Sequence, residues 1–181
     1  MSRYAPVELL RADHDTSIFD CGSEPQTLWL RRYALISQQS GTGRVYVACR
    51  TSDRSVAGYY ALSAGSILAD DAPARIAAGT GRHPIPVVIL TRLGVDLAEQ
   101  GRGLGSALVR DALQRAATAA GTIGIRALVI HAETSKAAAF YRNLDSAFEP
   151  SPADPLQLIL LMKDVRAAIR RAVGEPGVSD G

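Results

Sequence analysis

Short apolar runs alternate along the chain with stretches in which apolar residues return every three or four positions. The runs predict β-strands, at residues 7–10, 45–49, 56–63, 87–95, 126–131 and 156–162. The helical period predicts α-helices, at residues 26–39, 103–119, 137–142 and 164–173. Two shorter segments, 13–19 and 72–78, are expected to form helical turns.

The helix expected over residues 103–119 has the clearest pattern. One face carries the apolar residues Val109, Ala112, Leu113, Ala116 and Ala120, and the other carries Arg110, Asp111, Gln114 and Arg115. This is the 3.6-residue period of a helix with one buried side, and Gly121 follows as a C-terminal stop.

The helix expected over residues 26–39 begins just after Pro25, which suits a first turn. Trp29, Tyr33 and Ile36 are predicted to face inward, with Arg31 and Arg32 more exposed. The next two strands flank Ser52-Asp53 and predict an antiparallel hairpin.

Residues 64–84 are expected to be largely irregular, with prolines at 73 and 84 and glycines at 79 and 81. A long insertion inside a compact domain is more often functional than inert. The order of elements predicts a mixed α/β fold around a single, partly antiparallel sheet. We expect one domain over residues 1–173 and a flexible tail over 174–181.

Composition sets limits on function. The chain has 181 residues, is 47% hydrophobic and 21% charged, and carries a net charge of +2, which indicates a globular protein and gives no argument for nucleic acid by itself. Cys21 and Cys49 have no metal-ligand spacing, and no metal is expected. No signal peptide is indicated, and the apolar runs fall short of the roughly 20 residues of a membrane span. A cytoplasmic protein without membrane contact is expected.

Residues 100–106 form a glycine-rich turn between the strand 87–95 and the following helix. Such a turn aims backbone N–H groups at one spot, at the positive end of the helix dipole, where a pyrophosphate can bind. A Walker loop is excluded because no Gly-Lys-Ser/Thr follows. The dinucleotide pattern fails at Ser106 or at Leu108, depending on which glycine begins it. The spacing that fits is Gln-x-x-Gly-x-Gly, with Gln100, Gly103 and Gly105.

That loop resembles the acetyl-CoA pyrophosphate loop of the GNAT acetyltransferases, and the order of elements is the GNAT order. Phe140-Tyr141, about forty residues later, is a second GNAT feature. Other segments are similar to the GNAT toxins of bacterial toxin–antitoxin pairs: Phe19-Asp20-Cys21-Gly22, Gly58-Tyr59-Tyr60-Ala61-Leu62-Ser63, Ile85-Pro86, Ile123-Gly124, His131-Ala132 and Phe148-Glu149-Pro150-Ser151-Pro152. The similarity covers roughly residues 7–162. One departure is the absence of a glycine before Phe148, so the turn after Tyr141 is expected to be reshaped.

The resemblance implies a GNAT fold, with a mostly antiparallel sheet that splays between its fourth and fifth strands. It implies transfer of acetyl from acetyl-CoA to the α-amino group of aminoacyl-tRNA, which blocks translation. It also implies a ribbon-helix-helix type antitoxin as partner, and a homodimer.

The resemblance also implies site residues. Tyr141 would be the general acid that protonates the leaving CoA thiolate, since a phenol with a pKa of about 10 stays protonated at neutral pH. The expected acetyl-CoA contacts are Leu93, Gly94, Val95, Gln100, Gly101, Arg102, Gly103, Leu104, Gly105, Ser106 and Asn143. No obvious base is present, which suits an α-amine, because its pKa of roughly 7.7–8.0 leaves a useful fraction neutral. His131 and Glu133 are candidates for a weak acceptor, with a structural role favoured for each.

For the RNA, the expected phosphate contacts are Arg31, Arg32, Arg75, Arg82 and Arg92. Cys21 has no activating partner in sequence and is interpreted as structural. Two alternatives stay open. One keeps the chemistry with a small amine or a protein N-terminus as acceptor, and the other is an acyl-CoA-binding module without turnover.

Overall fold

The computed structural model describes residues 2–174, so the expected tail lies, except for Gly174, outside the described residues. These residues fall into two compact units. The first unit is the chain up to Ser63 together with Leu90–Ala112, and the second is Ala64–Ile89 together with the chain from Leu113 onward.

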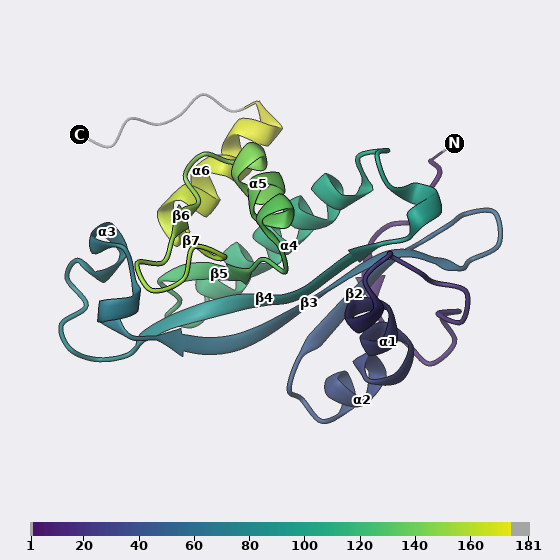
Figure 1. The fold of residues 1–181 in the computed structure, drawn as a ribbon, viewed down its shortest axis with the longest axis horizontal. Helices are drawn as coiled ribbons and strands as arrows, with labels where there is room; N and C mark the ends of the chain where they lie inside the picture. The colour runs from purple at the N-terminus through teal and green to yellow at the C-terminus, as the bar shows by residue number, and fades with distance from the viewer. Residues whose placement is uncertain (1, 175–181) are drawn as a thin grey trace. The chain divides into compact units, whose positions relative to one another are not determined.

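Most of the secondary structure follows the predicted order (Figure 1). The strands are β1 (Glu8–Leu9), β2 (Arg44–Cys49), β3 (Val56–Ile67), β4 (Ile85–Val95), β5 (Ala127–His131), β6 (Glu149–Pro150) and β7 (Gln157–Leu161). The helices are α1 (Glu24–Arg32), α2 (Ala34–Gln39), α3 (Ala74–Ala77), α4 (Leu104–Ala120), α5 (Ser135–Leu144) and α6 (Met162–Val173). Two 3₁₀ turns, η1 (Ala69–Asp71) and η2 (Leu97–Glu99), precede α3 and α4.

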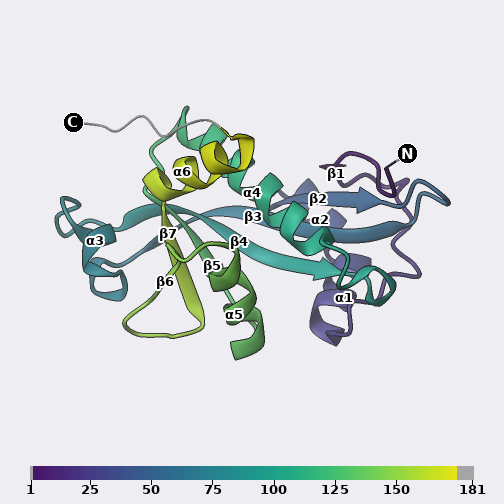
Figure 2. The ribbon, with the colours of Figure 1, turned by 90° about the horizontal axis from the view of Figure 1, so that it is seen from above.

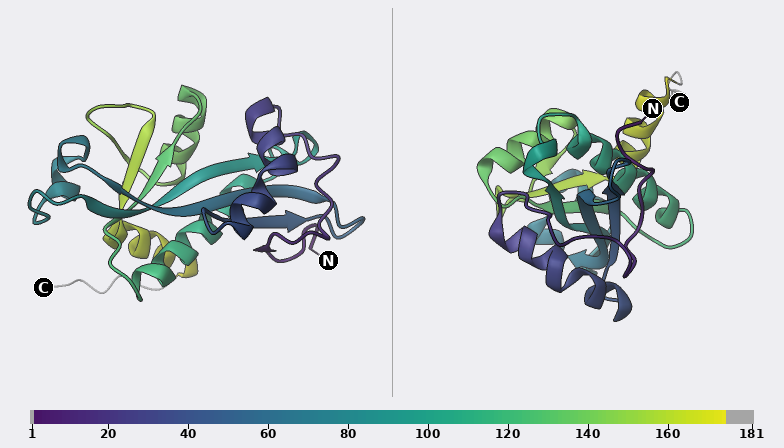
Figure 3. Two further views of the ribbon diagram at one scale, coloured as in Figure 1. Left: turned by 90° about the horizontal axis from the view of Figure 1, so that it is seen from below. Right: turned by 90° about the vertical axis from the view of Figure 1, so that its right-hand side faces the viewer.

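In the first unit the strands are ordered β1-β2-β3-β4. The predicted hairpin is confirmed, since β2 and β3 pair antiparallel with Tyr46 opposite Tyr60. Figures 1 and 3 show α1 and α2 together on one side of β2 and β3. Phe19, Leu30, Ala34, Val45, Val47 and Tyr59 are among the buried side chains of this core.

The helix predicted over residues 26–39 is two helices in the structure, and its predicted inward face is partly wrong. Ser23 caps α1 by accepting a hydrogen bond from the Gln26 amide, and α1 ends at Tyr33, whose φ of −116° lies far from the usual helical value. Because of this break, Tyr33 and Ile36 are 52% and 61% exposed, and Leu30 and Ala34 are the buried pair.

The helical turn predicted over residues 13–19 is also wrong. This segment forms non-helical turns. The Asp15 carboxylate accepts hydrogen bonds from the amide and the hydroxyl of Ser17, at 2.9 and 2.6 Å. Such side-chain bonds to nearby main-chain groups compete with helix formation.

In the second unit the strand order is β3-β4-β5-β7-β6, with β4 and β5 parallel. Figure 2 shows β5 and β7 side by side, with α5 following β5 and α6 following β7. Alternate residues of β5 point to opposite faces and all but His131 are buried, which explains why this strand reads as a continuous apolar run. The strand β6, which pairs with β7, was not predicted.

The segment after Ser63 is more ordered than the sequence suggests. The strand β3 continues to Ile67, and the helical part predicted at 72–78 is confirmed as α3, whose Ile76 is buried in the same core cluster as Ile85 and Val129. The Arg126 guanidinium donates hydrogen bonds to the carbonyls of Ile76 and Ala78, at 3.2 and 3.0 Å. These contacts are non-local, so no short pattern announces them.

The amphipathic helix predicted over 103–119 is confirmed as α4. Val109, Ala112, Leu113 and Ala116 are buried as expected, and Leu104 and Leu108 extend the buried face. Within residues 2–174 there is no helix long and apolar enough to cross a membrane. The same residues contain no group of three or more metal-ligating side chains.

Candidate active site

The glycine-rich loop lies between β4 and α4 in the first unit. Gly101 and Gly103 have positive φ angles of 72° and 85°, and a Cβ built on either would meet no atom within 4 Å. Glycine is therefore favoured there by backbone conformation and not by crowding. The Ala107 amide donates to the Gly103 carbonyl at 3.1 Å and begins the helix. The earlier amides of an α-helix have no partner within the helix, which makes this end of α4 suited to an anion.

Gln100 acts within the protein. Its side-chain amide donates hydrogen bonds to the carbonyls of Cys21 and Val95, both at 3.0 Å. The loop is thereby tied to the last residue of β4 and to the segment before α1. The glutamine of the Gln-x-x-Gly-x-Gly pattern thus has a structural role here beside any contact to a ligand.

A buried ionic cluster precedes the loop. The Glu99 side chain is 4% exposed and accepts hydrogen bonds from Tyr4 Oη at 2.7 Å, Arg50 Nε at 2.9 Å and Arg3 Nε at 3.0 Å. Arg50 Nη2 also donates to Asp96 Oδ1 at 2.9 Å. The Tyr4 hydrogen bond, with those of the arginines, lowers the pKa of Glu99 to about 2 against the opposing effect of burial.

The end of β4 is packed closely against aromatic rings of the first unit. A Cβ on Gly94 would lie 2.8 Å from Tyr59 Cε1 and 3.3 Å from Phe19 Cζ. A residue larger than glycine does not fit at this position unless the buried rings shift. Glycine at 94 therefore allows the strand backbone to approach the core closely.

Tyr141 lies on α5 in the second unit, where Thr134 caps the helix by accepting from the Ala137 amide. The ring is 6% exposed. It contacts Phe140 and Phe148, with centroid distances of 5.2 and 6.3 Å. Burial raises the pKa of Tyr141 above its ordinary value, so the phenol is protonated at neutral pH. This state is the one that a proton donor requires.

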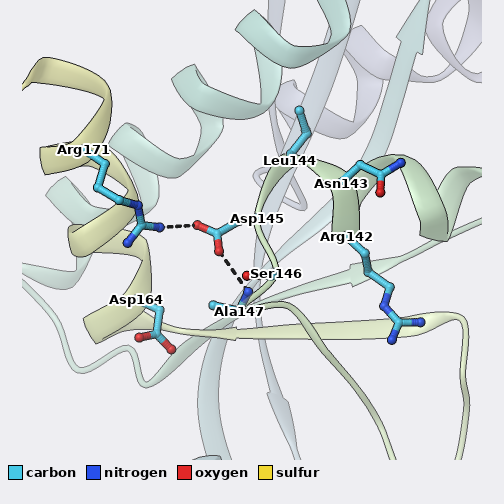
Figure 4. A pocket seen from close by; sticks show the side chains of 8 residues that line it. All are labelled: Arg142, Asn143, Leu144, Asp145, Ser146, Ala147, Asp164 and Arg171. Atoms are coloured by element: carbon cyan, nitrogen blue, oxygen red, sulfur yellow. Dashed lines mark hydrogen bonds and ion pairs between the residues drawn. The ribbon is translucent and has the colours of Figure 1, made fainter.

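The turn after α5 forms without a glycine. Asp145 ends the helix in an extended conformation, and its carboxylate accepts from the Ala147 amide at 2.9 Å and from Arg171 Nη2 at 2.7 Å (Figure 4). Phe148 is buried beyond this turn. A hollow of about 570 Å³ at the turn is lined by residues 142–147 with Asp164 and Arg171. In Figure 4 Arg142 and Asn143 extend from α5 away from the Asp145–Arg171 pair.

Residues 41–145, more than half of the chain, match the family described as acetyltransferase (GNAT) domain. The chain belongs to the GNAT acetyltransferase family. This confirms the family and the fold inferred from the loop and from the order of elements.

This GNAT protein is 48% identical over 170 residues to a tRNA-acetylating toxin of Mycobacterium tuberculosis, with 93% of this chain and 99% of the relative covered. It is 30% identical over 162 residues to a probable toxin TacT of Sinorhizobium fredii, with 85% and 88% covered. The solved structure of AtaT complexed with acetyl-methionyl-tRNAfMet has a TM-score of 0.82 at 30% identity, with 91% and 98% covered. A mutant of AtaT has also been solved bound to the C-terminus of the antitoxin AtaR and to acetyl-CoA, at a TM-score of 0.77 and 29% identity, with 92% and 98% covered.

The predicted RNA contacts of the GNAT protein lie in different settings. In the first unit, Arg31 and Arg32 are exposed on the last turn of α1, and Arg92 is partly buried. In the second unit, Arg82 is exposed on the turn before β4. Arg75 is paired with Asp164 at 2.7 Å and with Glu149 at 3.5 Å, so its charge is already met by two carboxylates. Arg75 is the weakest of the five as a phosphate contact.

Three other residues make contacts within the protein. His131 Nε2 is 2.9 Å from the side-chain amide of Gln157 on the neighbouring strand β7. Cys21 Sγ contacts the Thr27 hydroxyl at 3.4 Å and the Ser23 carbonyl at 3.6 Å. Asp96 follows the end of β4 and caps η2 by accepting from the Ala98 amide.

The sequence interpretation missed the residues that surround the loop. Tyr4, Arg50 and Glu99 are at least 46 positions apart from one another in the sequence, so no local motif connects them. Asp145 was missed as well. An aspartate whose carboxylate accepts a hydrogen bond from the main-chain amide two positions later is a known turn signal.

Proposed function

We propose that this GNAT protein transfers acetyl from acetyl-CoA to the α-amino group of aminoacyl-tRNA and thereby blocks translation. The observation that carries the proposal is the 48% identity to a tRNA-acetylating toxin over nearly the full length of both chains. The loop before α4 and the protonated, buried phenol of Tyr141 support the same chemistry. Residues 1–173 act as one acetyltransferase domain.

Different parts of the chain bind different parts of acetyl-CoA. The main chain of Leu93, Gly94 and Val95 pairs with the pantetheine arm, and the loop 100–106 takes the pyrophosphate. Arg102 is half-exposed, with Nε 3.9 Å from Glu99, and is available for a phosphate oxygen. Asn143, one half-turn after Tyr141, contacts the CoA arm.

Acetyl-CoA supplies an acetyl group as a thioester whose leaving group is the CoA thiolate. The neutral α-amine forms the new C–N bond to the acetyl carbonyl carbon as the C–S bond breaks. Tyr141 donates its hydroxyl proton to the departing sulfur, and the proton lost from the amine returns to the phenolate or to water. The phenol is regenerated, and a strong base is unnecessary for an amine of such low pKa.

The product is an aminoacyl-tRNA whose amide nitrogen no longer attacks a peptidyl ester, so peptide-bond formation stops. A protein with this activity requires control. AtaT was solved with the antitoxin AtaR, and we infer that this chain has an antitoxin of the ribbon-helix-helix type, acts as a homodimer and works in the cytoplasm, where aminoacyl-tRNA is used.

The experiment that tests the proposal combines expression with mass spectrometry. Expression of the chain is expected to arrest growth, and RNase-digested aminoacyl-tRNA from the arrested cells is expected to carry α-N-acetyl groups. Purified protein with acetyl-CoA and aminoacyl-tRNA should give the same product. Acetylation of free amines or protein N-termini with unmodified tRNA would favour the small-amine alternative. Binding of acetyl-CoA without release of CoA to any amine would favour the non-catalytic alternative.

A further inference from the structure

The segment that links β4 to the glycine-rich loop is three residues of 3₁₀ turn, η2, followed directly by Gln100. Glu99, its last residue, points its carboxylate into the first unit and is almost fully buried. The carboxylate receives hydrogen bonds from three side chains: Tyr4, Arg3 and Arg50. A buried carboxylate with three donors is a well-fixed group.

The other end of η2 is fixed by the same arginine. Arg50 Nη2 binds Asp96 Oδ1 at 2.9 Å, and its Nη1 donates to the Ser55 hydroxyl at 2.9 Å. The second oxygen of Asp96 accepts from the Asp20 amide at 3.1 Å. Arg50 therefore bridges the two carboxylates that begin and end the link, and its planar guanidinium fixes the distance between them.

We propose that the Glu99–Arg50 pair is a positioning device that sets the glycine-rich loop for the pyrophosphate of acetyl-CoA. This inference rests on the proposed function. Gly101 and Gly103 give the loop amides freedom to reach a ligand, but the same freedom spreads them over many conformations. An anchored residue immediately before the loop reduces that spread, so the ordering cost of binding falls.

The chain near its N-terminus completes the anchor. The Ala5 amide donates to the Cys49 carbonyl at 2.9 Å, and the Thr51 amide donates to the Arg3 carbonyl at 3.1 Å. These main-chain bonds hold Tyr4 beside Arg50, so that the Tyr4 hydroxyl reaches Glu99. Tyr4, Arg50 and Glu99 are thus positioning residues that do not themselves touch the reacting atoms.

The test compares two acetyl donors in steady-state turnover with aminoacyl-tRNA. Acetyl-CoA carries the pyrophosphate, and acetyl-pantetheine lacks it. In Glu99→Gln we expect the KM for acetyl-CoA to rise by about tenfold, with kcat at saturation and kcat/KM for acetyl-pantetheine within about twofold of wild type. Tyr4→Phe removes one hydrogen bond and no charge, and it should raise the KM for acetyl-CoA by about threefold with the other constants unchanged. This variant also tests the proposal if Glu99→Gln does not fold.

Glu8→Gln is the matched control. Glu8 also pairs with an arginine, Arg11, in the first unit but away from the loop. The KM for acetyl-CoA and the kcat of Glu8→Gln should both match wild type. Equal changes for the two donors, or unchanged constants for both in Glu99→Gln and Tyr4→Phe, would overturn the positioning role. A wild-type protein that accepts acetyl from neither donor would refute the proposed function instead.

Discussion

The guanidinium carbon of Arg92 lies 5.4 Å from the centre of the Trp29 ring. Trp29 in turn stacks on Tyr59 with a centroid distance of 5.9 Å and an interplanar angle of 15°. A cation over an aromatic face gains about 0.5–1 kcal/mol at an exposed site. The Arg92 guanidinium is therefore held against Trp29. Arg92 directly precedes Leu93, where the proposed contacts to the pantetheine arm begin.

We predict that Arg92→Glu lowers acetylation of aminoacyl-tRNA by at least about tenfold, because a fixed positive charge near RNA phosphates is replaced by a negative one. Affinity for acetyl-CoA, measured by calorimetry, should stay unchanged. Arg44→Glu, which makes the same charge change at the exposed start of β2, is the control. Equal rates for the two variants, or equal salt dependence of wild type and Arg92→Glu, would count against this contact.

Tyr141→Phe is predicted to reduce turnover by at least about 100-fold, the range expected when a general acid is lost. The ring remains packed against Phe140 and Phe148, so thermal stability and acetyl-CoA affinity should be retained. Tyr33→Phe removes a hydroxyl from an exposed tyrosine and should turn over like wild type. Near-wild-type release of CoA by Tyr141→Phe would exclude the general-acid role.

Gly103→Ala isolates the contribution of loop conformation to acetyl-CoA binding. Gly103 and Gly41 both have positive φ and open space around a built Cβ, so alanine at either costs about 1 kcal/mol of backbone strain. We predict similar losses of stability, but a raised KM for acetyl-CoA only in Gly103→Ala. A KM shift of the same size in Gly41→Ala would show that the effect follows stability and not the loop.

Gly94→Ala should destabilise the protein through steric overlap. The new Cβ would lie 2.8 Å from Tyr59 Cε1, and overpacking of this kind costs about 1–3 kcal/mol. Gly124→Ala, where the built Cβ meets nothing within 4 Å, should be neutral or slightly stabilising. Urea unfolding of the two variants measures the difference, and equal midpoints would contradict the close approach of β4 to Tyr59.

Low pH should lower the free energy of unfolding through protonation of Glu99. Its pKa is lowered from 4.5 to about 2 in the folded state, so its stabilising contribution is complete above pH 4.5 and is lost as the pH falls towards 2. The full contribution is of the order of 3 kcal/mol. The groups that face its carboxylate are Tyr4, Arg3, Arg50 and Arg102, with Asp96 on the far side of Arg50.

Urea unfolding of wild type and Glu99→Gln at several pH values checks this dependence. The difference in free energy of unfolding should be largest near neutral pH and shrink between pH 4.5 and 2. A difference that does not change over this interval would show that Glu99 does not titrate in the folded protein as described.

Much of the fold was readable from local patterns. The two apolar runs around Ser52-Asp53 that predict the β2–β3 hairpin, and the helical period of α4, depend on neighbouring residues, and both elements are confirmed. The break at Tyr33 could not be predicted from the sequence, because two apolar faces overlap in this segment and only tertiary packing decides which of them is buried. Leu30 and Ala34 are buried, whereas Tyr33 and Ile36 are exposed.

For the site, the sequence by itself determined the loop, since glycine spacing and the start of a helix are local features, and with Phe140-Tyr141 it determined the family. Tertiary structure decided how the loop is held. The contacts of Glu99 with Tyr4 and Arg50 join residues 95 and 49 positions away, and the carboxylates that occupy Arg75 come from 74 and 89 positions away. Local propensity specifies an element from its neighbours, whereas the partner of a charged side chain is fixed only when distant segments pack together.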